Sequence, residues 1–266
     1  MVTGASSGIG EAAARMFAAR GARVVIIAEH DENLNRVAKS INSTGGCAIP
    51  MVADFSLPGG VAGLVKRAEE AAGPIDILVN NAGVGMQALI GERPMADIRY
   101  LFEVNFFAMT TLCAEILPRM AERGSGRIIN VSSAAAQFGC AGFSAYSASK
   151  AALHVFTQAL RVEARVKGVA VTEIIPISVR TPFFDHVRGN AYRPLGVVIS
   201  AEQVADCIIR SAESKRPPPE MWPFRWIRLV FLLNTIAPGL VVRYNTRIFD
   251  RNRSAMREQT KGKRVE

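Results

Sequence analysis

Buried-strand patterns alternate with helical patterns along the first 215 residues. Runs of consecutive apolar residues, typical of strands covered on both faces, occupy 23–28, 48–53, 75–79, 127–132 and 170–175. Helical patterns cover 11–17, 31–43, about 59–72, 95–122 with an interruption near Asn105, 146–166 and 201–214. Strands that alternate with helices at this pace predict an α/β fold with a doubly wound, mainly parallel sheet of the Rossmann type.

A glycine-rich turn joins the first strand to the first helix. Gly4, Gly8 and Gly10 follow Thr3 directly, and the helical pattern begins at Glu11. Glycines let the backbone turn sharply and approach a pyrophosphate, whose charge a helix N-terminus favours. The spacing differs from the commoner Gly-x-Gly-x-x-Gly of dinucleotide-binding folds. A plain turn of small residues is the alternative, but the position between strand and helix favours phosphate binding.

Further polar or turn-forming residues follow other strands. Asp54, Asn80–Gly83, Ser133 and Pro176 each come just after a predicted strand. The carboxyl ends of parallel strands share one edge of the sheet, where ligands of such folds bind. We therefore expect these residues to line one cleft with the glycine loop.

Tyr146 and Lys150 are four residues apart in a predicted helix, so their side chains share one face. An ammonium group beside a phenol favours the phenolate and lowers the pKa of the tyrosine from roughly 10. A tyrosine of this kind can exchange a proton with a substrate oxygen near neutral pH. A solvated helix face would give the same spacing, so the pair gains meaning only from its surroundings.

Charge divides the chain into two parts. The 266 residues are 49% apolar and carry a net charge of +9. Residues 210–266 hold 13 Lys/Arg against 5 Asp/Glu, a net charge of +8. Because Pro217–Pro219 also break the chain, we expect a dinucleotide-binding domain over 1–215 and a basic, partly apolar, helical C-terminal extension over 216–266.

Cysteines and histidines suggest neither disulfide nor metal chemistry. Cys47, Cys113, Cys140 and Cys207 lie far apart, which is typical of buried thiols in a reducing cytoplasm. The histidines at 30, 154 and 186 have no metal-binding spacing, so we expect no metal site. No signal-peptide pattern is present. Only Met1–Thr3 precede the glycine loop, so we expect a short first strand or a start that has lost residues.

With these motifs in place, residues 2–215 resemble a short-chain dehydrogenase/reductase. The Thr3–Gly10 loop, Asn80–Gly83, Asn105, Ser133 and Tyr146-x-x-x-Lys150 occur in that family's order and spacing. The resemblance implies an oxidoreductase that moves a hydride between a nicotinamide and a secondary alcohol or ketone. It also implies a small-molecule substrate and a homo-oligomer.

The resemblance implies a role for each motif. Tyr146 would be the general acid/base, and Lys150 would hold the nicotinamide ribose and lower the pKa of Tyr146. Ser133 would stabilise the substrate oxygen, and Asn105 would hold a water that extends a proton relay from Lys150. The implied cofactor-binding residues are Gly4, Ser6, Ser7, Gly8, Ile9, Gly10, Glu29, Asp54, Phe55, Asn81, Ala82, Gly83, Tyr146, Lys150, Pro176, Val179 and Thr181.

Two positions depart from the family pattern. Ile177 follows Pro176 where the family usually has glycine, so the local backbone is expected to differ. Ala28 and Glu29 end the second strand, where relatives that prefer NAD have Asp and relatives that prefer NADP have Arg one position later. A carboxylate accepts a hydrogen bond from a ribose 2′-hydroxyl and repels a 2′-phosphate. We therefore predict NAD in preference to NADP, which stays the alternative.

A substrate lid is expected at about 182–200. It is moderately apolar through Phe183, Phe184, Tyr192, Leu195 and Val197. These side chains either meet the substrate or pack the lid against the body. Together with Met86, Phe138 and Phe143, they would suit a hydrophobic alcohol or ketone such as a lipid or steroid.

The C-terminal extension mixes tryptophan, arginine and aliphatic residues from Trp222 to Leu233. Such a mixture suits a helix lying in a membrane interface, and the cations between Arg243 and Arg264 would add attraction to anionic lipids. Its apolar run over 229–242 is too short to span a bilayer. Peripheral contact with the inner membrane surface through 222–264 is one interpretation. A helix that closes the cleft or makes a dimer contact is the other. Its aromatic residues sit among aliphatic ones, so nucleic acid is not an expected partner.

Two classes of function remain open. One is an enzyme; the other is a catalytically inactive dinucleotide-binding sensor or scaffold, recruited to a membrane by the extension. The intact set of Asn105, Ser133, Tyr146 and Lys150 favours the enzyme.

Overall fold

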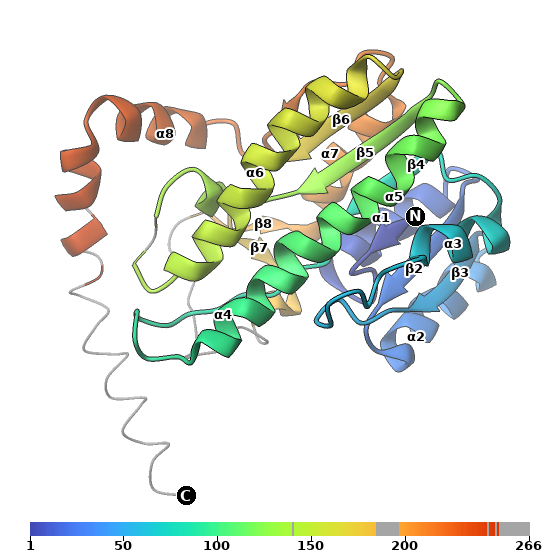
Figure 1. Ribbon diagram of the computed structural model, residues 1–266, viewed down its shortest axis with the longest axis horizontal. Coiled ribbons are helices and arrows are strands. Elements are labelled where there is room, and N and C mark those ends of the chain that lie inside the picture. Colours follow the sequence, from blue (N-terminus) through green and yellow to red (C-terminus); the bar gives the residue numbers. More distant parts are fainter. Residues whose placement is uncertain (140, 185–196, 244, 248, 250–266) are drawn as a thin grey trace, which may run out of the picture.

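The computed structural model describes residues 1–139, 141–184, 197–243, 245–247 and 249. In this part of the chain, seven parallel strands form one sheet in the order β3-β2-β1-β4-β5-β6-β9, with helices on both faces (Figure 1). The predicted Rossmann-type α/β fold is thereby confirmed. The strands are β1 (Val2–Thr3), β2 (Arg23–Ala28), β3 (Cys47–Val52), β4 (Ile77–Asn80), β5 (Gly126–Val131), β6 (Val169–Ile174) and β9 (Glu220–Met221). The helices are α1 (Gly8–Ala18), α2 (Asp31–Ser43), α3 (Leu64–Ala72), α4 (Met95–Phe102), α5 (Ala108–Glu122), α6 (Ser144–Arg165), α7 (Ala201–Glu213) and α8 (Ile227–Ile236).

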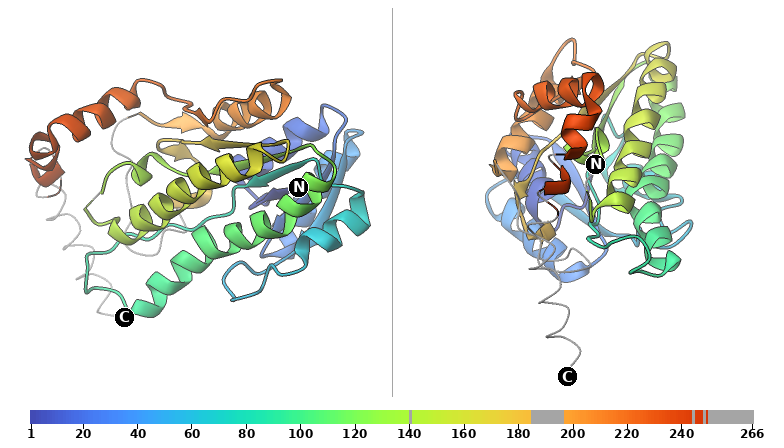
Figure 2. Two further views of the ribbon diagram at one scale, coloured as in Figure 1. Left: turned by 45° about the horizontal axis from the view of Figure 1, so that its top comes forward. Right: turned by 90° about the vertical axis from the view of Figure 1, so that its left-hand side faces the viewer.

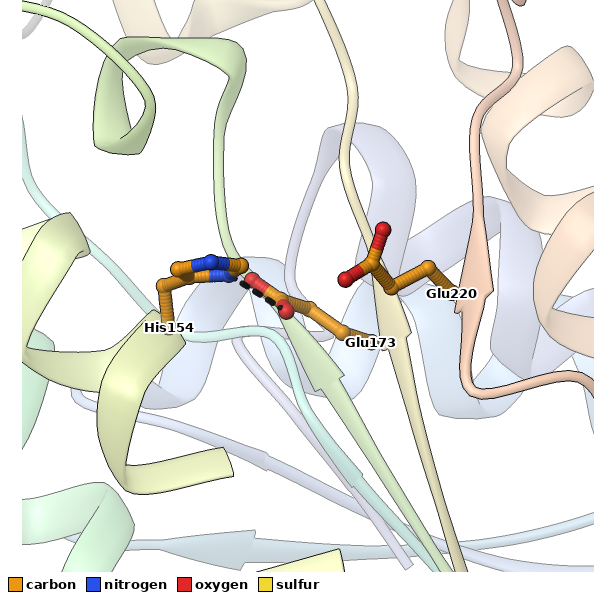
Figure 3. A group of neighbouring side chains, drawn as sticks. All are labelled: His154, Glu173 and Glu220. Carbon is orange, nitrogen blue, oxygen red and sulfur yellow. Dashed lines mark hydrogen bonds and ion pairs between the residues drawn. The ribbon is translucent and has the colours of Figure 1, made fainter. Parts of the chain in front are cut away.

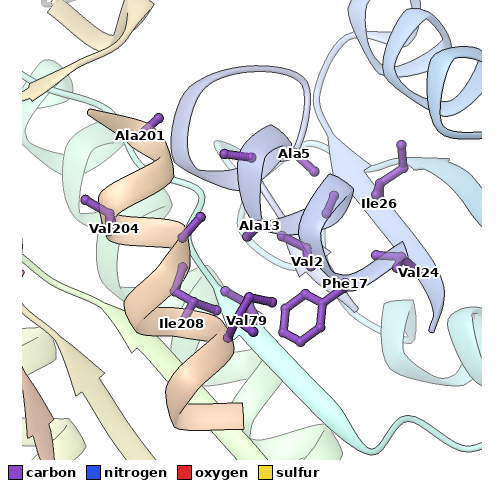
Figure 4. Close-up of a cluster of buried hydrophobic side chains, with 14 of the residues drawn as sticks. Val2, Ala5, Ala13, Phe17, Val24, Ile26, Val79, Ala201, Val204 and Ile208 are labelled. Carbon is purple, nitrogen blue, oxygen red and sulfur yellow. The ribbon is translucent and has the colours of Figure 1, made fainter. Parts of the chain in front are cut away.

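Two apolar cores lie on opposite faces of the sheet. Successive side chains of a strand point to opposite faces, so Val24 and Ile26 of β2 enter one core while Val25 and Ile27 enter the other. Helices α1, α2 and α7 cover the first core, part of which Figure 4 shows between α1, α7 and the sheet. Helices α3, α5 and α6 cover the second. Burial on both faces explains why the strands read as continuous apolar runs.

Most element boundaries agree with the predictions to within one or two residues. Helix α1 begins at Gly8, three residues before the expected start at residue 11. The helix expected from about residue 59 begins only at Leu64, because Gly59 and Gly63 take positive φ angles of 77° and 69° in the preceding turns. Strand β4 begins at Ile77 instead of residue 75. Between α4 and α5, the expected interruption is a π-helix, η1 (Glu103–Phe107), centred on Asn105.

A small second sheet holds the two ends of the expected lid together. Strand β7 (Val179–Arg180) pairs in parallel with β8 (Ile199–Ser200), and a 3₁₀ turn, η3 (Pro182–Phe184), follows β7. Residues 185–196, which include Tyr192 and Leu195 of that lid, lie outside the described residues, as does Cys140. Another 3₁₀ turn, η2 (Ala134–Ala136), follows β5.

The C-terminal extension joins the body in two ways. Strand β9 pairs with β6 at the edge of the sheet. Beyond it, Phe231 of α8 packs against Trp222 and Phe138, with ring centroids 5.3 and 5.4 Å apart. Figures 1 and 2 show α8 at the end of the molecule away from α3 and β3. The residues after 249 lie outside the described part, and with them most cations of the expected lipid-binding tail.

Only one continuous helix of the described residues is long and apolar enough to cross a membrane. It is the stretch Met95–Glu122 formed by α4, η1 and α5, and half of its apolar window is buried inside the molecule. It packs against the sheet as a core helix of the second core. A second, bent pair of helices, Ile227–Ile236 and Pro238–Arg247, passes the same test together but turns by 114° between them.

Candidate active site

The glycine loop leaves β1 at the point where the order of the sheet reverses. Gly4 and Gly8 have positive φ angles of 63° and 55°, which glycine adopts at no steric cost. A Cβ atom at Gly10 would lie 2.2 Å from the carbonyl oxygen of Gly4, so no larger residue fits. Thr181, directly after β7, reaches the same loop, because a Cβ at Gly8 would lie 3.0 Å from its methyl group. The loop is thus a backbone cradle of the kind that a pyrophosphate requires.

Thr3 ties this loop to the segment after β4. Its buried hydroxyl accepts hydrogen bonds from the backbone N–H groups of Asn81 and Ala82, at 2.9 and 3.0 Å. The side-chain amide of Asn81 donates in return to the carbonyl oxygens of Thr3 and Gly4. The two segments that are expected to bind the cofactor, Gly4–Gly10 and Asn81–Gly83, therefore lie side by side. Ser7, at the start of α1, is exposed and makes no capping hydrogen bond.

Asn105 is buried in the π-helix and fixes two neighbouring segments. Its Oδ1 accepts a hydrogen bond from the N–H of Val84 at 2.8 Å, and its Nδ2 donates to the carbonyl of Val84 at 3.0 Å. The same Nδ2 lies 3.1 Å from the hydroxyl of Ser149, which donates to the carbonyl of Tyr146 at 2.8 Å. Asn105 thus connects the loop after β4 to the helix that carries Tyr146 and Lys150. Its expected role in holding a water stays a prediction.

Lys150 is buried between β5 and the loop after β4. Its Nζ donates to the carbonyl of Val131 at 3.2 Å. A Cβ built on Gly83 would lie 3.4 Å from this Nζ and 3.2 Å from Oδ1 of Asn105, so these three residues meet at one point. Burial lowers the pKa of Lys150 to about 8, against the opposing charge of Glu173. A charged Lys150 would favour the phenolate of a nearby tyrosine.

Tyr146 stands half-buried one helical turn before Lys150. The rings of Phe143 and Phe183 flank it, with centroids 6.3 and 6.0 Å from the Tyr146 ring. Turn η2, which begins after Ser133, packs against α6. The hydroxyl of Ser133 accepts a hydrogen bond from the N–H of Ala135 at 3.1 Å and stays partly exposed.

Ser132, Pro176 and Met86 are further residues of this region, and they differ in burial and contacts. The neighbouring Ser132 is buried, with its hydroxyl 3.5 Å from the carbonyl of Ile174, so Ser133 is the more exposed of the two serines. The carbonyl of Pro176 accepts from the N–H of Ala134 at 2.8 Å, which places Pro176 beside this turn. Met86, expected near the substrate, is buried.

The adenosine side of the site follows β2 and β3. Glu29 is exposed at the end of β2. Asp54 is occupied by its own turn, since its Oδ1 accepts from the N–H and hydroxyl of Ser56 at 2.7 and 2.6 Å. The side chains of Phe55 and Val179 are buried in the apolar cores, so only their backbone can line a cofactor groove.

Three contributors were missing from the sequence-based set. Thr3 binds the backbone of Asn81 and Ala82, and Ser149 binds Asn105. Each stands directly beside a motif of the sequence, and this position could have indicated its role. Arg36 of α2 lies over the glycine loop, where its guanidinium donates to the carbonyl of Ser6 at 3.3 Å and pairs with Glu11 at 3.0 Å. No sequence signal marked Arg36, because its approach to the loop depends on how α2 packs against α1.

Comparison with known families agrees with this geometry. Residues 1–191 match the family model for short chain dehydrogenases. The chain is 34% identical over 216 residues to a ketoacyl reductase, HetN, of Nostoc sp. PCC 7120, covering 81% of this chain and 75% of that protein. It is 31% identical to a fatty acyl-CoA reductase of Acinetobacter baylyi, over 98% of this chain and 88% of that protein. The chain belongs to the short-chain dehydrogenase/reductase family.

Solved structures share the same fold. A short-chain dehydrogenase from Sphingobium yanoikuyae in complex with NADPH has a TM-score of 0.77 and 28% identity, over 91% of this chain and 94% of that chain. A short-chain dehydrogenase/reductase from Burkholderia phymatum in complex with NAD has a TM-score of 0.80 and 25% identity, over 90% and 93%. One of these two structures thus contains NADPH and the other contains NAD.

Proposed function

We propose that this protein is an NAD(H)- or NADP(H)-dependent oxidoreductase that interconverts a secondary alcohol and a ketone. The observation that carries the proposal is the meeting of buried Lys150, Asn105 and Gly83, one helical turn from Tyr146. The glycine cradle and Asn81–Gly83 fit a dinucleotide, and the nicotinamide supplies the hydride chemistry when bound. Tyr146 exchanges the proton with the substrate oxygen, Lys150 favours the phenolate, and Ser133 hydrogen-bonds the same oxygen.

A hydrophobic substrate is part of this proposal. Phe143 and Phe183 flank the Tyr146 ring and give the reacting end of the site an apolar lining. The ketoacyl and fatty acyl-CoA reductases among the relatives add support for a substrate with an acyl chain. A screen of ketones of increasing chain length, read by the absorbance of the reduced nicotinamide, tests it. A kcat/KM that does not rise with chain length would contradict this part of the proposal.

The test of the catalytic assignment is Tyr146→Phe. We expect kcat to fall by at least about 10³-fold, since proton transfer by a positioned side chain contributes roughly 10²–10⁴-fold. Cofactor affinity, measured by quenching of protein fluorescence, should change less than threefold, because the phenyl ring keeps its packing. Tyr100→Phe, which removes the hydroxyl of a tyrosine on α4, is the matched control and should leave kcat unchanged. An unchanged kcat in Tyr146→Phe would refute the role.

A catalytically inactive dinucleotide-binding sensor or scaffold is the alternative function. Such a protein would bind the cofactor and show no turnover with any member of the ketone series. The buried Lys150 argues against it, because an ammonium group is costly to bury without a function. Burst measurements at high enzyme concentration separate a slow enzyme from an inactive protein.

NAD in preference to NADP is the proposed cofactor choice. Exposed Glu29 at the end of β2 supports it through repulsion of a 2′-phosphate. Arg36 works in the other direction, but its guanidinium is already paired with Glu11. Glu29→Ala should raise the ratio of kcat/KM for NADPH over NADH about tenfold, whereas Glu32→Ala, which removes an exposed carboxylate of α2, should leave it unchanged. A wild-type preference for NADPH would overturn the choice.

Peripheral membrane contact through the extension is a further part of the proposal. Trp226, Leu229, Leu233 and Ile236 recur at helical spacing along one side of α8 and are exposed, while Phe231 packs the other side against the body. An exposed apolar stripe next to cations suits the surface of an anionic membrane. Leu233→Glu should reduce co-sedimentation with phosphatidylcholine–phosphatidylglycerol vesicles severalfold, and Leu57→Glu, at an exposed leucine of the body after β3, should not. Equal binding by the two variants would remove this part.

A homo-oligomer in the cytoplasm completes the proposal. Val155 and Val162 of α6 and Val166, which caps its C-terminus, are exposed at spacings of seven and four residues, as an interface between two copies would require. Light scattering after size exclusion should show more than one chain per particle, and Val162→Glu should shift it toward the monomer. The buried free thiols of Cys113 and Cys207 support a reducing compartment. Cys47 is exposed, so the expectation that it is buried was wrong.

A further inference from the structure

Three side chains from three elements converge at the edge of the sheet, away from the glycine cradle. His154 lies on α6, one turn after Lys150, while Glu173 lies on β6 and Glu220 on β9 (Figure 3). One potential ligand atom from each residue lies within 4.8 Å of the other two. We propose that this cluster, called here the edge triad, binds a divalent transition-metal ion, with Zn²⁺ the best match. Imidazole and carboxylate groups are ligands that Zn²⁺ accepts, and three protein ligands leave one position for water.

Glu173 is the residue that calls for a cation. Its carboxylate is fully buried, and Oε2 lies 2.8 Å from Nδ1 of His154. The other oxygen, Oε1, has no hydrogen-bond partner. Figure 3 shows the Glu173 carboxylate between the imidazole and the Glu220 carboxylate. A buried carboxylate oxygen without a partner is costly, and a second carboxylate nearby adds repulsion. A divalent ion would remove both costs.

The neighbouring cations Arg161 and Lys150 form hydrogen bonds with backbone carbonyl groups. The guanidinium of Arg161 donates to the carbonyl oxygens of Val171 and Pro219, at 3.2 and 2.7 Å. The ammonium of Lys150 donates to the carbonyl of Val131. Both add positive potential at some distance, but each directs its hydrogen bonds to backbone carbonyls. The carboxylates of the edge triad thus keep lone pairs for an ion.

Outer hydrogen bonds orient two of the ligands. The indole N–H of Trp222 donates to Oε2 of Glu220 at 3.1 Å. The side-chain amide of Gln158 lies 2.9 Å from Nε2 of His154. With Nδ1 of His154 bound to the ion, Nε2 carries the proton and donates to this amide through its oxygen. Second-shell bonds of this kind fix ligand orientation in metal sites. With metal–ligand bonds of about 2.0–2.2 Å, two tetrahedral donors stand roughly 3.3–3.6 Å apart. Glu220 is half-buried on a two-residue strand, so a small rotation of its side chain can close the site.

A bound ion would link the C-terminal extension to the helix of the active site. His154 shares α6 with Tyr146 and Lys150, and Glu220 lies close before Trp222, against which Phe231 of α8 packs. The ion would therefore be structural: it would hold β9 and α8 against α6. This inference concerns a second site and does not depend on the proposed oxidoreductase activity.

The test is Zn²⁺ binding to the full chain, purified with EDTA and dialysed. It uses the Cys47→Ser background, because the exposed thiol of Cys47 would bind Zn²⁺ by itself. Calorimetric titration should give one Zn²⁺ per chain, and Zn²⁺ should raise Tm by several degrees. Glu220→Gln should weaken the affinity at least tenfold and abolish the rise in Tm. Glu163→Gln, which removes an exposed carboxylate of α6, is the matched control and should behave as the parent.

Cobalt gives a second readout. Co²⁺ in the edge triad should produce visible absorption bands that His154→Gln loses. Glu173 is buried, so Glu173→Gln would change folding as well as metal binding. Glu220 is half-buried, and its substitution is therefore the one that tests metal binding alone. The proposal is overturned if the parent binds no Zn²⁺, or if Glu220→Gln binds it as tightly as Glu163→Gln does.

Discussion

Lys150 shows how a single residue of the active site costs stability. Its side chain is 4% exposed, and burial lowers its pKa to about 8 from the ordinary value of 10.5. The folded state therefore disfavours the ammonium form that the unfolded chain holds up to higher pH. By linkage, the cost is fully present below about pH 8 and is relieved as pH rises toward 10.5, because the unfolded state then binds more protons than the folded state.

We therefore expect Lys150→Met to be more stable and inactive at once. At pH 7 the gain in unfolding free energy should be on the order of 1–3 kcal/mol, since one unit of pKa corresponds to 1.36 kcal/mol and the lost hydrogen bond to Val131 takes back part. The gain should shrink between pH 8 and pH 10.5. Urea unfolding across this range measures it, with exposed Lys39→Met as the control. A variant less stable than the wild type at pH 7 would contradict the sign.

At the scale of elements, the π-helix η1 is the interruption that the sequence predicts near Asn105. The extra residue of a π-helix turns Asn105 toward the loop after β4, where one amide serves both backbone groups of Val84 and the hydroxyl of Ser149. Single π turns inside α-helices are frequent at functional sites. The helix thus places a polar group in a wall that is otherwise apolar.

Asn105→Ala should destabilise the protein by about 2–4 kcal/mol, because it leaves at least two polar groups without partners. It should also lower kcat, since the anchor between the Val84 segment and the Tyr146 helix is lost. Chemical unfolding followed by circular dichroism gives the first quantity. The exposed Asn33→Ala of α2 is the control. A change below about 0.5 kcal/mol would mean that Asn105 does not anchor the two segments.

Elements whose pattern is local were predictable, and contacts that depend on packing were not. The apolar run 23–28 and the amphipathic stretch 31–43 have the same bounds as β2 and α2. The site motifs could be placed at one edge because parallel strands bring their carboxyl ends together. By contrast, the scattered histidines gave no sign that His154 would lie near two carboxylates. The approach of His154 to two carboxylates depends on the register of β6 with β9, a strand from a distant part of the chain.

At the scale of the whole molecule, the C-terminal extension is part of the folded body. The basic residues after 209 belong to a segment that supplies the last strand of the sheet and packs an aromatic side chain against the loop after Ser133. The division at residue 215 stays a prediction about composition and charge. The last strand of the sheet, β9, ends at Met221, six residues after this division.

This edge strand has a consequence for anyone who shortens the protein. Only two residue pairs, Glu173 with Glu220 and Ile174 with Met221, cover the outer side of β6 in the described part of the chain. A chain that stops at 215 bares a row of unpaired amide and carbonyl groups, and bare strand edges recruit other chains. Such a truncation should form large particles in dynamic light scattering within hours of purification, whereas a chain that stops at 226 should keep the particle size of the intact protein. If both truncated chains keep a small particle size, the pairing of β9 with β6 is not what prevents association between molecules.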